Sequence, residues 1–93
     1  MNKNKLRYAI LKEIESGNRS FRYSDLGVDQ NIFDDQIRFL DREEMIIGVL
    51  YADNIVYDLN QVEITLKGEN YLEQNSPWSK FYRGFKEIKG FIK

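Results

Sequence analysis

The residue types that usually carry out catalysis are mostly missing from this chain. Its 93 residues include no cysteine and no histidine, which removes thiolate nucleophiles, zinc–thiolate sites and the commonest general base. Adjacent carboxylates occur at Asp34-Asp35 and Glu43-Glu44, and carboxylates can do acid–base work or bind magnesium. Neighbours along one helix do not converge on a point, so both pairs are interpreted as solvated surface. The sequence therefore predicts no enzyme activity, no cofactor and no metal site.

Charge is strongly segregated along the chain, although the net charge is only −1. Residues 1–22 hold six basic and two acidic groups, residues 23–75 three and twelve, and residues 76–93 five and one. No apolar run reaches the length of a membrane span, and charges interrupt the apolar residues after the basic start. We expect a cytoplasmic protein without a membrane partner, although a basic aromatic helix at the end would also suit an anionic lipid surface.

The first part of the chain predicts three helices around a helix-turn-helix. Apolar residues at helical spacing predict a helix from Lys3 to Ser16, with Gly17 as a left-handed cap. Residues 19–23 alternate and are expected to form a short strand. Ser24 and Asp29 are expected to cap two further helices that meet across Gly27.

The helix expected from Gln30 to about Glu43 has two different faces. Its apolar face is assigned to the core and contains Ile32, Phe33, Ile37 and Leu40. Its polar face is the one that a DNA-reading helix would place in the major groove, and it contains Asn31, Asp34, Asp35, Arg38, Asp41 and Arg42. That face is net acidic, and Asp34 is placed to pair with Arg38 one turn later. Little positive charge is left to meet phosphate.

A β-hairpin is expected next, formed by residues 46–52 and 55–59 around an Asp53-Asn54 turn. Residues 62–64 complete the sheet, and Thr65 caps a helix running to Gln74 or Asn75. Leu66, Tyr71 and Leu72 are expected to reach the core from that helix. Gly68 weakens a first helical turn, so we expect it to lie against another backbone segment.

The last segment is expected to be a separate amphipathic helix. Ser76 as cap and Pro77 at the first helical position predict its start. Its apolar stripe, at spacings of three and four, comprises Trp78, Phe81, Tyr82, Phe85, Ile88 and Ile92. Two interpretations stay open: the stripe packs on the first helix, or it joins two copies in a dimer. We therefore divide the chain into a domain at 1–75 and a helix at 76–93 that packs on the same domain or on a partner.

These elements together predict an α+β winged helix-turn-helix, with a three-helix core, a β-hairpin wing and additional C-terminal helices. The chain also resembles the YjcQ-like family of small bacterial and phage proteins. The resemblance runs nearly end to end through segments 5–14, 33–35, 46–49, 67–72, 78–80 and 86–89. It implies the winged-helix fold and an association with prophages, and it brings no catalytic residues.

Two functions follow from these predictions. The first is nucleic-acid binding with a regulatory role in transcription, through Asn31, Arg38 and Arg42 on bases and Lys80, Arg83, Lys86 and Lys89 on phosphates. The acidic central segment and a hairpin turn without lysine or arginine disfavour it. The alternative is a protein-interaction or dimerisation module without DNA binding, which the aromatic stripe and the opposite charges of the segments favour.

Overall fold

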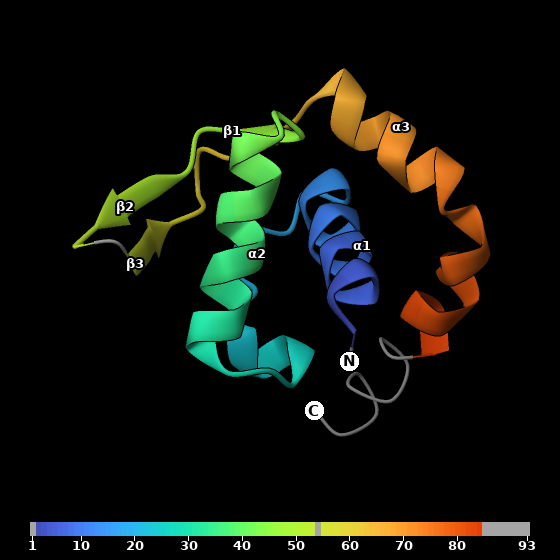
Figure 1. The fold of residues 1–93 in the computed structure, drawn as a ribbon, viewed down its shortest axis with the longest axis horizontal. Helices are drawn as coiled ribbons and strands as arrows, with labels where there is room; N and C mark the ends of the chain where they lie inside the picture. Colours follow the sequence, from blue (N-terminus) through green and yellow to red (C-terminus); the bar gives the residue numbers. More distant parts are fainter. Residues whose placement is uncertain (1, 54, 85–93) are drawn as a thin grey trace.

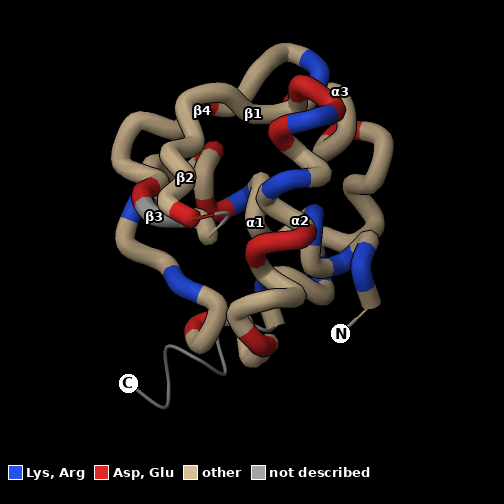
Figure 2. The backbone as a smooth tube through the Cα atoms, turned by 60° about the vertical axis from the view of Figure 1, so that its left-hand side comes forward, with Lys and Arg blue, Asp and Glu red and all other residues tan. Residues whose placement is uncertain are grey.

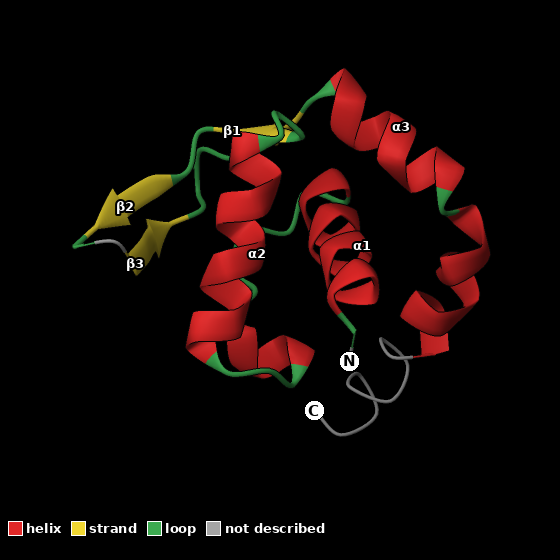
Figure 3. Cartoon of the chain, in the orientation of Figure 1, coloured by secondary structure: helices red, strands yellow, loops and turns green. Residues whose placement is uncertain are grey.

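The fold was analysed in a computed structural model, which describes residues 2–53 and 55–84. It is an α+β arrangement of helices with small antiparallel strand pairs, shown in Figures 1 and 3. The elements in chain order are α1 (Lys3–Glu15), the 3-10 turn η1 (Tyr23–Leu26), α2 (Gln30–Arg42), β1 (Ile46–Ile47), β2 (Leu50–Ala52), β3 (Ile55–Asp58), β4 (Glu63–Ile64), α3 (Leu66–Gln74) and the 3-10 turn η2 (Ser76–Trp78). Residues 79–84 continue as helix.

Helix α1 is the centre of the molecule, with α2 on one side and α3 on the other (Figure 1). Its N-terminus is capped by Asn2, whose Oδ1 accepts a hydrogen bond of 2.8 Å from the Lys5 amide. Its C-terminal end is followed by Gly17 at φ +90°, the left-handed residue that the sequence predicts. The apolar side of α1 is almost wholly buried, so the first predicted helix and its core face are confirmed.

Two antiparallel strand pairs lie between α2 and α3 along the chain. Strand β1 pairs antiparallel with β4, and β2 pairs antiparallel with β3 as a hairpin that extends away from the helices (Figure 1). The strand predicted over 46–52 is interrupted, because Gly48 has φ +90° and a Cβ there would lie 2.3 Å from the Gln61 carbonyl oxygen. Asp53 takes a positive φ of 52° at the predicted turn, and Asn54 lies outside the described residues.

Five predictions for local structure are wrong. Residues 19–22 have no regular structure, and the helical turn that follows begins at Tyr23 with Arg22 as its cap, so Ser24 is not the cap. Ile32 was assigned to the core but is 42% exposed, and Leu66 is 72% exposed. Ser76 lies inside a 3-10 turn capped by Asn75. At 19–22, Ile32 and Leu66 the local pattern lacks the covering or pairing element that it needs within the described residues, and Ser24 and Ser76 lie inside turns that begin earlier than expected.

The junction between β4 and α3 is formed as predicted. Thr65 Oγ1 accepts a hydrogen bond of 3.1 Å from the Gly68 amide and donates one of 2.6 Å to the Glu44 carbonyl. A Cβ on Gly68 would lie 2.3 Å from the Met45 carbonyl oxygen. The close backbone approach expected at Gly68 is therefore confirmed, and it fixes the direction in which α3 leaves the sheet.

The described part of the C-terminal segment packs on α1. The Tyr8 ring meets Trp78 edge-on at a centroid distance of 6.2 Å and Tyr82 at 6.3 Å. Tyr82 is buried, and that burial together with the neighbouring Glu13 carboxylate raises the pKa of its hydroxyl. Phe85, Ile88 and Ile92 of the predicted stripe lie outside the described residues. Within the described ranges no helix is long and apolar enough to cross a membrane.

Candidate interaction surfaces

The outward face of α2 holds the three residues predicted to read bases. Asn31 and Arg42 are exposed and Arg38 is half-buried, so all three lie at the surface of one helix. They span three turns of that helix, with the hairpin beside them (Figure 1). The predicted face therefore exists as a continuous surface, and its charges decide what it can bind.

Charges on this face are largely satisfied within the molecule. Arg38 donates from Nη2 to Asp35 Oδ1 at 2.7 Å. The Tyr51 hydroxyl, from β2, donates to Asp41 Oδ2 at 2.8 Å. Burial is the main reason that the pKa of Tyr51 is raised, and the Asp41 carboxylate raises it further. Helix and hairpin thus hold each other through charged and polar contacts. What remains for a ligand is a shallow hollow lined by Arg38, Asp41, Arg42 and Tyr51.

Asp34 does not lie on that face, contrary to the prediction. It is 5% exposed and its Oδ2 accepts from the Val56 amide of β3 at 3.4 Å. Burial raises the pKa of its carboxyl, and the positive charge of Arg38 acts against that shift. The charge of Arg38 thus acts on Asp34 as predicted, but the ion pair that Arg38 forms on this helix is with Asp35.

The β2–β3 hairpin has an inner and an outer face. Tyr51 and Val56 are register partners and face the body of the domain, because the Tyr51 hydroxyl donates to Asp41 of α2 and Val56 packs against the core. Ala52 and its register partner Ile55 therefore point to the opposite side. Leu50 pairs with Asp58 beyond a register shift, and alternation along β2 places its side chain on the same side as Ala52. Leu50 is 49% and Ile55 48% exposed. We call Leu50, Ala52 and Ile55 the outer face of the hairpin; it is apolar and uncovered in the described structure.

Two arginines share one aromatic ring between α1 and α2. The Arg7 guanidinium carbon lies 3.5 Å from the Phe39 ring centroid, and that of Arg42 lies 5.8 Å from it. Arg7 also donates from Nε to Gln36 Oε1 at 2.6 Å. Within residues 2–53 and 55–84 neither arginine forms an ion pair. Nothing in the sequence around Arg7 indicates that α2 supplies an aromatic ring to it.

Basic residues of the C-terminal segment lie away from α2. Lys80 and Arg83 are exposed on helical residues 79–84, which lie beyond α1 from α2 in Figure 1. Figure 2 shows lysine and arginine spread over several elements and acidic residues along α2. Lys86 and Lys89 lie outside the described residues. The structure therefore does not gather the described basic candidates with Arg38 and Arg42 into one surface.

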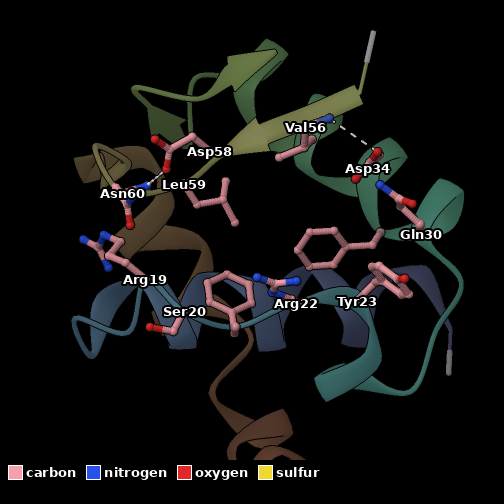
Figure 4. A pocket seen from close by; sticks show the side chains of 12 residues that line it. Arg19, Ser20, Arg22, Tyr23, Gln30, Asp34, Val56, Asp58, Leu59 and Asn60 are labelled. Atoms are coloured by element: carbon pink, nitrogen blue, oxygen red, sulfur yellow. Dashed lines mark hydrogen bonds between the residues drawn. The ribbon is translucent and has the colours of Figure 1, made fainter. Parts of the chain in front are cut away.

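A further hollow lies between the segment at 19–23 and β3. It has a volume of about 610 Å³, and its wall includes Phe21, Arg22, Phe33, Asp34 and Val56 (Figure 4). Sequence reasoning missed this hollow, because it expected residues 19–23 to occupy the place of a strand beside the hairpin. No cluster of three or more acidic side chains placed to hold a metal ion occurs in the described structure.

Comparisons with known proteins show what this chain is similar to. The model of the YjcQ family, described as YjcQ protein, matches residues 5–91. A chain from Bacillus subtilis (strain 168), described as "Uncharacterized protein YjcQ", is 55% identical over an alignment of 95 positions, which covers 100% of both chains. The solution NMR structure of the YjcQ protein from Bacillus subtilis is similar with a TM-score of 0.72 and 51% identity, over 80% of this chain and 96% of that one.

Proposed function

Since the chain belongs to the YjcQ family, whose name gives no activity, we propose its function from its surfaces: a non-enzymatic winged-helix module that binds another protein. The winged-helix assignment is supported by the element order, in which α1, η1 and α2 are followed by a hairpin beside α2. Gly27 at φ +70° makes the turn between η1 and α2. A fold of this kind serves many binding functions, so the surface has to decide among them.

The outer face of the hairpin is the observation that carries the proposal. Leu50, Ala52 and Ile55 expose apolar surface on a ribbon that extends from the body of the domain. Clustered exposed apolar side chains on a projecting element are typical of a protein contact. Residues 46–64 include Asp53, Asp58 and Glu63 and no lysine or arginine. The partner is therefore expected to offer an apolar surface bordered by basic side chains.

Electrostatics also favour a protein over a duplex. On α2, Arg38 is paired with Asp35 and Asp41 accepts a hydrogen bond from Tyr51, so Arg42 is the arginine of this face without an ion pair in the described structure, and the hairpin adds only acidic residues beside it. Most of the affinity for nucleic acid comes from neutralised phosphates, and an acidic surface repels them. An apolar contact has no such requirement, because its free energy comes from the area removed from water.

In-cell photocrosslinking tests the proposal. A photoreactive amino acid replaces Leu50 in the full chain at its natural expression level, and the matched control carries it at Glu73, exposed on α3. We expect a discrete protein adduct from the Leu50 position alone, which disappears when Ile55→Lys is added. Light scattering then tells a second copy from a different protein. Equal adducts from both positions, or none from Leu50, would contradict the proposal.

Nucleic-acid binding is the second candidate, and the arginines around Phe39 favour it. Arg7 and Arg42 form no ion pair in the described structure and lie on the side of α2 that continues from Arg38. Guanidinium groups held in this way suit phosphate oxygens. Fluorescence anisotropy with a random duplex at low ionic strength is the test, with Arg42→Gln as the variant and Lys67→Gln, exposed on α3, as its control. Binding that both variants leave unchanged would refute this route.

A further inference from the structure

The outer face of the hairpin is narrow. Leu50, Ala52 and Ile55 lie on one side of a ribbon of two strands. Neighbouring strands are about 4.8 Å apart, so such a ribbon presents a face about 10 Å across, which is also the diameter of a single helix. A face of this width fits one short segment of a partner better than the broad surface of a globular domain.

The charge along this part of the chain is acidic throughout. Residues 46–64 include Asp53, Asp58 and Glu63 and no lysine or arginine. A segment that binds here is therefore expected to combine apolar side chains with basic ones. Residues 85–93 of this chain have that composition, since they include four large apolar side chains, three lysines and one glutamate.

The described surface of a second copy offers no such combination. Among residues whose exposure the structure describes, the large apolar side chains that are exposed all belong to residues 23–66. Residues 23–75 hold three basic and twelve acidic groups, so that surface would repel the hairpin. Residues 1–22 are basic, but the apolar side of α1 is almost wholly buried. Residues 85–93, which lie outside the described residues, are thus the part of the chain whose composition suits the outer face.

Within one chain this segment starts on the far side of the molecule from the hairpin. Tyr82 packs on Tyr8 of α1, whereas the hairpin packs on α2 (Figure 1). Nine residues reach at most about 30 Å when fully extended, and the molecule measures 33 Å along its longest axis. A path around two helices to the hairpin of the same chain would use most of that reach. A second copy is therefore the better source of the segment.

We propose that the outer face of the hairpin binds residues 85–93 of a second copy of this chain. The inference rests on the proposed function for the site and adds the identity of the partner. Apolar side chains of the segment cover Leu50 and Ile55, and its lysines meet the acidic border of the hairpin. Each copy has one hairpin and one such segment, so mutual exchange gives a symmetric dimer with two identical contacts.

Photocrosslinking between labelled and unlabelled copies tests the partner. The full chain carries a photoreactive amino acid in place of Leu50, and equal amounts of nitrogen-15-labelled and unlabelled protein are mixed, left to exchange, irradiated and digested. We expect peptides from residues 85–93 joined to the peptide that holds the probe, including pairs of mixed isotope, because the two belong to different copies. Pairs of a single isotope only would mean that the segment covers the hairpin of its own chain. That result, crosslinks to other residues alone, or no crosslink would overturn the inference.

Charge-reversed variants measure what the lysines contribute. Lys86→Glu with Lys89→Glu changes the proposed segment, and Lys3→Glu with Lys67→Glu makes the same change in net charge at exposed positions of α1 and α3. Reversal in the segment affects four charge pairs of a symmetric dimer, each worth about twofold in the dissociation constant. Sedimentation equilibrium should show a dissociation constant about tenfold higher for the first variant, and a change within about twofold for the control. An equal effect of the two variants would contradict the contact.

Failure of this inference can be told from failure of the proposed function. A purified chain that gives no crosslink between copies, together with an in-cell adduct from Leu50 to a different protein, would refute the second copy and leave the outer face as a binding site. No adduct from Leu50 in either experiment would refute both.

Discussion

Replacing Gly68 by alanine should destabilise the protein, although the same change stabilises most helices. A Cβ at this position would lie 2.3 Å from the Met45 carbonyl oxygen and 2.7 Å from Ile64 Cγ1. A carbon and an oxygen in contact are usually at least about 3.3 Å apart. The first turn of α3 must therefore move by about 1 Å away from β1 and β4.

The magnitude follows from what that movement disturbs. The Thr65 amide donates to the Met45 carbonyl at 3.0 Å, and Thr65 Oγ1 donates to the Glu44 carbonyl. Overpacking costs about 1–3 kcal/mol and a weakened hydrogen bond about 1 kcal/mol, against a gain of about 1 kcal/mol in helix propensity. We expect a net loss of about 2 kcal/mol in the free energy of unfolding, which lowers Tm by about 8–16 °C for a domain of this size.

Urea unfolding of the Gly68→Ala variant measures this loss, and Gly84→Ala is the matched control. Gly84 is also helical, but a Cβ there would meet nothing within 4 Å. The control should be at least as stable as the natural chain, because only the propensity gain applies. A Gly68→Ala variant as stable as the natural chain would refute the packing of α3 against Met45 and the account of the glycine that depends on it.

Three further variants test other contacts. Burial raises the pKa of Asp34, so ionising this carboxyl costs stability as the pH rises from about 4 towards the raised pKa. The stability of Asp34→Asn against urea should therefore rise relative to that of the natural chain between pH 4 and pH 7. A difference in unfolding free energy that stays constant over this range would contradict the prediction. Trp78→Ala removes a half-buried ring from Tyr8 and should cost about 2 kcal/mol in thermal unfolding, whereas an unchanged Tm would mean that the segment does not pack on α1. Arg7→Lys keeps the charge but loses the stacking on Phe39, and we expect the free energy of unfolding in a denaturant titration to fall by about 1 kcal/mol. An unchanged free energy of unfolding would refute the contact.

Sequence reasoning was correct where the signal is local. Thr65 as a cap, Gly17 as a left-handed residue and Gly27 as a turn residue were predicted from single positions, because caps, turns and positive φ depend on a few adjacent residues. Gly68 was also predicted, since a glycine that weakens a helix needs a reason and close packing is the common one. These positions fix where the elements begin and end.

It was wrong where the outcome depends on distant elements. The alternation at 19–23 fits a strand, but a strand also needs a partner at its edge, and β3 does not pair with it. Asp34 belongs to the polar pattern of α2, yet β3 lies across it and buries it. Leu66 fits the helical pattern, yet within residues 2–53 and 55–84 its side chain is left 72% exposed.

The candidate sites show the same division. Asn31, Arg38 and Arg42 were correctly placed at the surface of α2, because a helix pattern separates polar from apolar sides. Neither the apolar outer face of the hairpin nor the hollow beside β3 was predicted. Apolar residues in a strand are expected to be buried, so only the observed register shows that Leu50 and Ile55 point outward. The hollow lies between β3 and residues 19–23, where the predicted strand did not form.

The two proposed functions can be separated by salt, because they draw on different forces. An interface that neutralises four phosphates loses about 150-fold in affinity when salt rises from about 50 to about 200 mM. A contact through the outer face of the hairpin removes Leu50, Ala52 and Ile55 from water, and screening hardly weakens that apolar term. The acidic border at Asp53 and Asp58 would add a modest salt dependence with a basic partner. Affinity that falls steeply with salt therefore favours the arginines around Phe39, and affinity that changes only a few-fold favours the hairpin.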